Sequence, residues 1–144
     1  MAGKTELRNG VERWLDQLEN GVWAERSPIS RIYMVQTAFI TISQSLSGEV
    51  DLAGYGLVGL IFPTAWTAAS LSFQASDVSG GTFYNLRDDT GTEISVAAAG
   101  SVAIGCDVDG PKLAPFRFLR LRSGVAATTV PQAASIAITL ILKT

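Results

Sequence analysis

The hydrophobic pattern changes its period about a quarter of the way along the chain. Between residues 5 and 22, apolar side chains recur every three or four positions, which places them on one face of a helix. This stripe consists of Leu7, Val11, Trp14, Leu15, Leu18 and Val22. Thr5 suits an N-cap, and Asn20-Gly21 suits the end of a helix. The spacing therefore predicts an amphipathic helix within an N-terminal arm of residues 1–36.

From Phe39 onward the period is two, which is typical of half-buried strands. The clearest runs are residues 39–43, 70–76 and 136–143, with Ile40 and Ile42 on one face of the first and Ile136, Ile138, Leu140 and Leu142 on one face of the last. Residues 57–62 are apolar throughout, which predicts a central strand covered on both faces. Weaker candidates are residues 82–87, 93–96, 101–106 and 116–122.

Clusters of Gly, Asp and Ser separate these runs, and none of the gaps has the pattern of a crossover helix. About eight short strands with this punctuation indicate an all-β fold. We therefore expect an antiparallel β-sandwich, jelly-roll-like, over residues 37–144, preceded by the helical arm.

Charge and composition reduce the number of function classes that fit the chain. Residues 1–36 carry ten of the 24 charged side chains, and the net charge of −2 gives no basic block for nucleic acid. The chain has no histidine, which is the commonest acid–base group and metal ligand. Its one cysteine, Cys106, cannot form an intramolecular disulfide and fits a small buried side chain. No run of residues has the composition of a signal peptide or a membrane span, so we expect no membrane partner.

Three patterns that suggest ligand sites have simpler explanations. Residues 54–59 match G-x-G-x-x-G, but they lead into a strand rather than a helix, so we interpret them as a turn with close packing. Residues 88–91 and 107–110 place carboxylates at glycine turns, yet the remaining ligands of a calcium loop are missing. Neither a serine nucleophile elbow nor a general base is evident. We expect no enzyme activity, no cofactor and no metal.

Arginines crowd the segment of residues 116–122. As a strand, it places Phe118, Arg120 and Arg122 on one face and Arg117, Leu119 and Leu121 on the other. The arginines fit a solvated face with packed stems, which we favour because exposed ion pairs are common. They also fit an interface that binds carboxylates. Trp66 lies in an expected loop, where it suits sealing the end of the sandwich better than stacking on a sugar.

The segment LVGLIFPTAWTAASLSFQAS (57–76) resembles a family of small structural proteins of tailed bacteriophages. The runs FYNLRD (83–88), FLRLRSG (118–124), VPQ (130–132) and ITLILK (138–143) are similar to it as well, so the resemblance covers about residues 37–144. It implies a virion protein assembled in the host cytoplasm, and most specifically a β-sandwich decoration or cement protein of the capsid. The resemblance carries no catalytic motif.

The implied partners are the major capsid protein or other virion proteins, with further copies of the chain as a homo-oligomer, for example a trimer. A single helix is marginally stable in water, so its stripe must pack either on the chain's own β-sandwich or on a neighbouring protein. In the second case the stripe residues Leu7, Val11, Trp14, Leu15 and Leu18 contribute to these interfaces, together with Arg117, Arg120 and Arg122. Two alternatives stay open. One is a position in the tail, collar or fibre, and the other is a carbohydrate-binding jelly roll with Trp66, Tyr84 or Tyr55 as its aromatic platform.

Overall fold

The computed structural model describes residues 33–106 and 110–144. The predicted helix and its stripe residues Leu7, Val11, Trp14, Leu15 and Leu18 lie outside the described residues. The strands are β1 (Tyr33–Ile40), β2 (Val50–Asp51), β3 (Gly56–Ile61), β4 (Leu71–Ser76), β5 (Tyr84–Asn85), β6 (Ser95–Val96), β7 (Ala103–Gly105), β8 (Phe118–Val125), β9 (Thr128–Thr129) and β10 (Ile136–Lys143). One helical turn, α1 (Gly110–Leu113), precedes β8. No helix in this part of the chain has the length and hydropathy to cross a membrane.

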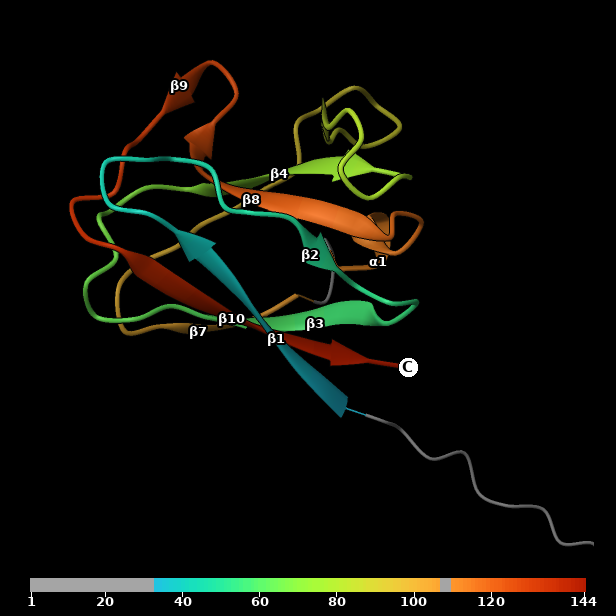
Figure 1. Ribbon diagram of the computed structural model, residues 1–144, viewed down its shortest axis with the longest axis horizontal. Helices are drawn as coiled ribbons and strands as arrows, with labels where there is room; N and C mark the ends of the chain where they lie inside the picture. The colour runs from blue at the N-terminus through green and yellow to red at the C-terminus, as the bar shows by residue number, and fades with distance from the viewer. Residues whose placement is uncertain (1–32, 107–109) are drawn as a thin grey trace, which may run out of the picture. The chain divides into compact units, whose positions relative to one another are not determined.

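The strands form two antiparallel sheets that pack face to face (Figure 1). One has four strands in the order β1-β10-β3-β7. The other has six strands along the path β2-β8-β4-β5, with β6 beside β4 and β9 beside β8. Without the short strands β6 and β9, eight strands remain and can be counted from 1 to 8 along the chain. In this count the order β1-β10-β3-β7 becomes 1-8-3-6, and the order β2-β8-β4-β5 becomes 2-7-4-5. This is the strand order of a jelly roll, so the predicted fold class is confirmed.

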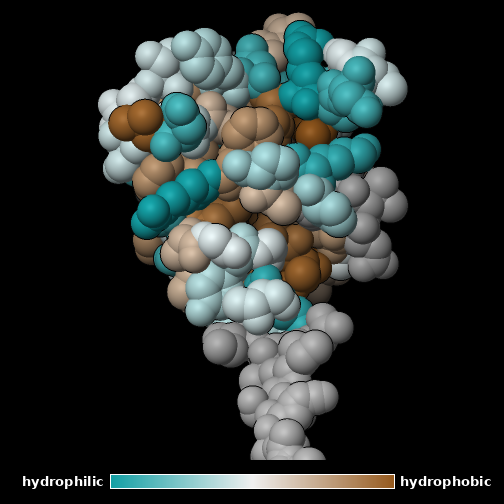
Figure 2. Space-filling model, turned by 90° about the vertical axis from the view of Figure 1, so that its right-hand side faces the viewer, coloured by the Kyte–Doolittle hydropathy of each residue, from teal (hydrophilic) through white to brown (hydrophobic). Residues whose placement is uncertain are grey.

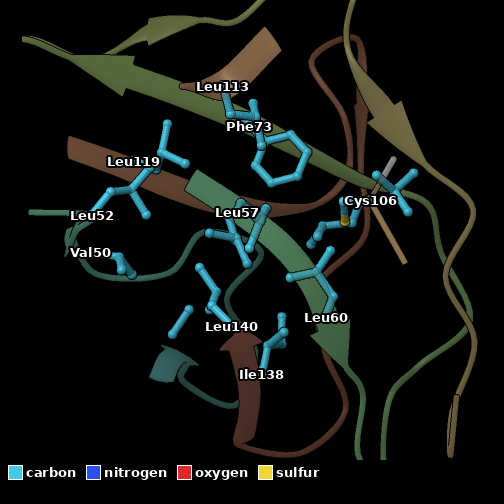
Figure 3. Packing of buried hydrophobic residues seen from close by; sticks show 14 of the residues in the cluster. Val50, Leu52, Leu57, Leu60, Phe73, Cys106, Leu113, Leu119, Ile138 and Leu140 are labelled. Carbon is cyan, nitrogen blue, oxygen red and sulfur yellow. The ribbon is translucent and has the colours of Figure 1, made fainter. Parts of the chain in front are cut away.

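The core fills the space between the sheets (Figure 3). The last predicted run is confirmed, because Ile136, Ile138, Leu140 and Leu142 of β10 are all buried. From the opposite sheet, Leu71 and Phe73 of β4 and Leu119 and Leu121 of β8 meet them. Trp66 closes one end, where its ring lies edge-on to Phe62 with centroids 4.9 Å apart. Alternation along the strands thus supplies both inner faces.

The segment 57–62 departs from its prediction. We expected cover on both faces, but Val58 and Ile61 of β3 are exposed, while Leu57, Leu60 and Phe62 are buried. A register shift where Ile141 and Leu142 of β10 meet β3 leaves Val58 as the extra residue of a β-bulge. The bulge allows Leu57 and Leu60, three positions apart, to face the core on one strand. The segment is continuously apolar although only one of its faces is buried.

The first sheet strand also differs from the sequence pattern at both ends. β1 begins at Tyr33, before residue 37, where we expected the β-domain to start. At its other end Ile42 does not continue the buried face of Ile40, because the strand stops and Ser43 adopts a positive φ of 70°. Ile42 is exposed, and its N–H donates to Ser135 Oγ. β1 is therefore longer at its start and shorter at its end than the alternation indicates.

Candidate interaction surface

Strand β8 sets the positions of the three predicted interface arginines. Leu119 and Leu121 face the core, so Arg120 and Arg122 lie on the outer face of the six-stranded sheet, opposite Gln74 and Ser72 of β4. Arg117 precedes β8 and is exposed. The predicted division of the strand into two faces is thus correct for residues 118–122. Whether the arginines contact a partner stays a prediction.

Arg122 is 5% exposed and uses its donors within the chain. Its Nη2 lies 2.7 Å from Glu93 Oε2, its Nη1 donates to Asn85 Oδ1 at 2.7 Å, and its Nε donates to Ser72 Oγ at 2.9 Å. Glu93 also accepts the N–H of Ala126. A buried guanidinium needs such satisfaction, because an unpaired buried charge is costly. The group therefore joins β4, β5 and β8 on the outer side of their sheet.

The other two arginines also have partners within the domain. Arg120 Cζ lies 4.4 Å from the ring centroid of Phe83, a cation–π contact. Arg117 binds both carboxylate oxygens of Asp51, at 2.9 and 3.1 Å. The hydrogen bond from Arg117 is the main reason that the pKa of Asp51 lies below its ordinary value. Of the three, Arg117 is the most exposed, while Arg120 is partly buried and its buried Nε has no hydrogen-bond partner in the described residues.

Two further carboxylates beside the same sheet have lowered pKa values. For Glu49 the chief cause is the backbone N–H of Gly80, followed by the hydroxyl of Ser79. For Asp88 the hydroxyl of Thr90 comes first, followed by the N–H of Thr92. These turns bind their own carboxylates. In the described ranges, no group of three or more metal-ligating side chains comes together, and Asp107 and Asp109 lie outside them.

The outer side of the four-stranded sheet has a different character. Its residues are Tyr33, Val35, Thr37 and Phe39 of β1, Ala137, Thr139, Ile141 and Lys143 of β10, Gly59 and Ile61 of β3, and Ala103 and Gly105 of β7. We call this set the outer apolar face. Tyr33, Val35 and Phe39 are 63%, 60% and 65% exposed. Lys143 is its charged member, and Lys143 Nζ lies 4.8 Å from the ring centroid of Tyr33.

A hollow of about 310 Å³ opens at the end of this face, between β1 and β10. It is lined by Phe39, Thr41, Ser135 and Ala137, together with the edges of two core isoleucines. Large apolar side chains next to one another on a surface mark an interaction site more often than single exposed ones do. The outer apolar face is therefore the best candidate for a functional site in the described part of the chain.

Figure 2 shows one end of the sandwich, where hydrophilic and hydrophobic atoms are interspersed between the two sheets. The sequence carried a signal for the outer apolar face that periodicity arguments overlook. In residues 33–40 both alternating sets are rich in apolar side chains, as in residues 57–62, although each strand buries one set in the core.

The aromatic candidates for a carbohydrate platform lie apart. Trp66 is 5% exposed and its Nε1 donates to the carbonyl of Ala69, so it seals the sandwich. Tyr84 is exposed on β5. Tyr55 is half-buried and lines a second hollow, of about 370 Å³, with Pro115, Phe116 and Arg117 among its other lining residues.

Comparisons with known proteins give one informative match. No protein-family model and no curated protein matches the chain. Among solved structures, the SPBc2 prophage-derived protein YomS is similar, with a TM-score of 0.53 and 13% sequence identity. The alignment covers 83% of this chain and all of YomS. At this identity the match supports the fold.

Proposed function

We propose that this chain is a structural protein of a phage particle, and specifically a decoration or cement protein that attaches to the head surface through its outer apolar face. The observation that carries the proposal is the exposure of Tyr33, Val35 and Phe39 on a face with a single charged side chain. The prophage origin of YomS and the resemblance to tailed-phage proteins support the assignment to a phage.

The chemistry of this face determines the kind of partner. A sheet surface of β-branched, aromatic and small side chains gains free energy by removing apolar area from water. A capsid surface that receives it must itself be apolar and without unpaired charges at the centre, because a buried unpaired charge opposes binding. The two arginines of β8 are held within the six-stranded sheet, so the proposed attachment does not depend on them.

The test compares one lysine substitution on each sheet. Ile61→Lys places a charge in the middle of the outer apolar face, whereas Ser95→Lys places one on the six-stranded sheet. Both positions are exposed, so both variants are expected to fold, which circular dichroism checks. We expect purified particles assembled with Ile61→Lys to carry at least about tenfold less of the protein than wild type, and Ser95→Lys to load normally.

Two results would contradict the proposal. Normal loading of Ile61→Lys would show that the outer apolar face is not the attachment surface. Absence of the wild-type chain from purified particles would reject a virion role altogether. Labelling of the tail, collar or fibre instead of the head by gold-tagged antibodies would keep the structural role and move its location.

A second candidate function, carbohydrate binding, has one observation in its favour. The hollow beside Tyr55 combines aromatic and apolar walls with the guanidinium of Arg117, which suits a sugar ring with several hydroxyl groups. Glycan-array binding that disappears in Tyr55→Ala and persists in Tyr84→Ala would favour this function. An array without signal would exclude it.

A further inference from the structure

The free backbone of β1 points to a second interaction, distinct from the proposed attachment to a capsid. Among the described strands, β1 lies at one edge of the four-stranded sheet with β10 as its neighbour in the sheet. The direction of its backbone groups follows from its neighbours. The N–H of Phe62 donates to the carbonyl of Val102, and the N–H of Cys106 donates to the carbonyl of Val58. At this end of β3, the backbone groups of the even-numbered residues therefore form hydrogen bonds with β7. The odd-numbered residues of β3 therefore bond toward β10.

The same alternation extends across β10 to β1. Thr139 and Ile141 of β10 pair with Ile61 and Gly59 of β3, so the odd-numbered residues of β10 form their backbone hydrogen bonds with β3. The even-numbered residues of β10 therefore form theirs with β1 on the other side. On β1 the partners are again even-numbered, as in the pair of Gln36 with Leu140. The backbone N–H and C=O groups of Tyr33, Val35 and Thr37 consequently point to the open side of the strand.

One hydrogen bond confirms this direction and marks where the open side ends. The carbonyl of Phe39 accepts the N–H of Gly48, 3.3 Å away, from outside β10. In the described residues, the unpaired stretch of the edge therefore runs from Tyr33 to Thr37, with Val35 at its centre. At the opposite edge of the sheet, β7 has three residues, whereas β1 has eight.

Proteins normally protect a long edge strand with charges, proline or a bulge, because free backbone groups pair readily with another strand. Residues 33–40 read YMVQTAFI and contain neither a charge nor a proline. The register with β10 is continuous, without a bulge. The edge thus has each property that favours the addition of a strand.

We propose that β1 of a second copy of this chain occupies the edge, antiparallel, with the two-fold axis at Val35. In this register Val35 faces Val35 and Tyr33 faces Thr37 of the other copy. Because the edge residues carry no charge, the symmetric pairing brings no like charges together. The two four-stranded sheets become one eight-stranded sheet, and the two outer apolar faces become neighbours on it.

The symmetry gives a sharp experiment with the full chain. Val35→Lys and Val35→Glu each place like charges opposite one another at the two-fold axis, whereas a mixture of the two variants places opposite charges there. The side chain points away from the core, so both variants are expected to fold. By sedimentation velocity, we expect wild type at twice the mass of one chain and each variant on the order of tenfold weaker in self-association. An equimolar mixture of the variants is expected to restore the double mass.

Ile61→Lys is the matched control, because it changes the same face away from the edge. It is expected to remain dimeric while losing attachment to particles, so the failure of this proposal and of the proposed function are distinguishable. Three results would overturn the edge pairing: wild type at the mass of one chain at every concentration, as when another segment of the same chain covers the edge; dissociation of Ile61→Lys; or a variant mixture that stays monomeric.

Discussion

The outward side chains of the two sheets differ in whether other parts of the same chain contact them. On the six-stranded sheet, Arg120 and Arg122 lie outward, yet Phe83, Asn85 and Glu93 from the segment after β4 contact them. On the four-stranded sheet, the outward side chains are mainly apolar and remain exposed in the described structure. On the six-stranded sheet the arginines thus receive contacts from their own chain, whereas no described contact covers the apolar side chains Tyr33, Val35 and Phe39.

This difference changes where an interaction site should be sought. Arginines are common at interfaces, but a guanidinium whose donors are already used has little to offer a partner. An exposed row such as Tyr33, Val35 and Phe39 offers apolar area that no described contact removes from water. A cluster of arginines in a sequence can therefore serve the fold, whereas a strand with apolar side chains on both faces can indicate an interaction surface.

The largest expected loss of stability comes from a substitution on the outer face of the six-stranded sheet. Arg122→Met should lower the free energy of unfolding by about 3–5 kcal/mol, because it removes the cation of a buried ion pair and leaves the Glu93 carboxylate without its counter-charge. Urea denaturation monitored by fluorescence measures the loss. Arg117→Met is the matched control, since its ion pair with Asp51 is exposed and its loss should lower the free energy of unfolding far less. Equal losses in the two variants would refute the structural role of Arg122.

A smaller effect is expected at the polar link between the two sheets. Gln132 precedes β10 and is buried, where its side chain bonds the N–H and the carbonyl of Thr67 and the hydroxyl of Ser123 on β8. Gln132→Ala leaves these groups unpaired and should cost about 1–3 kcal/mol. Gln74→Ala removes one long, exposed contact with Asn85 and should cost much less. Thermal unfolding of both variants checks the ranking.

Much of the sandwich could be predicted because burial on one face imposes a period of two. The run at residues 136–143 became β10 with each alternating isoleucine and leucine buried. The two-residue strands β2 and β9 were not predicted, since so short a segment has no period. The bulge at Val58 was not predictable either, because it arises from the register between β3 and β10, which are far apart in the sequence.

The candidate surfaces were harder to predict for the same reason. Periodicity placed Arg122 on an outward face, but its burial depends on Glu93 and Asn85, which arrive from another part of the chain. The open edge of β1 depends on strand order, and long-range pairing determines that order. Local patterns identify which side chains share a face, whereas tertiary contacts decide which face remains uncovered.

On the outer apolar face, a substitution should hardly change the free energy of unfolding. Phe39→Ser removes an exposed ring and should alter the free energy of unfolding by no more than about 0.5 kcal/mol. Ile40→Ser, one residue along, introduces a hydroxyl at a fully buried position and should cost several times more. Chemical denaturation of both variants compares the two sides of the same strand. A large loss in Phe39→Ser would show that the outer apolar face is covered within the monomer.

The smallest expected effect is a pH dependence of stability that arises on one side of the molecule. Asp51, Glu49 and Asp88 all lie on or beside the six-stranded sheet, and each has a pKa below its ordinary value in the folded protein. A carboxyl with a lowered folded-state pKa stabilises the fold above its unfolded-state pKa, and this contribution disappears as the pH falls through the folded-state pKa.

Unfolding midpoints in urea should therefore be constant from about pH 7 to pH 5 and decline gradually below that. Asp51→Asn should flatten part of the decline, because it removes the carboxyl that Arg117 binds. The outer apolar face contains no carboxyl group, so Phe39→Ser should leave the shape of the pH profile unchanged. A profile altered by Phe39→Ser but not by Asp51→Asn would reverse the assignment of charge to one face and apolar surface to the other.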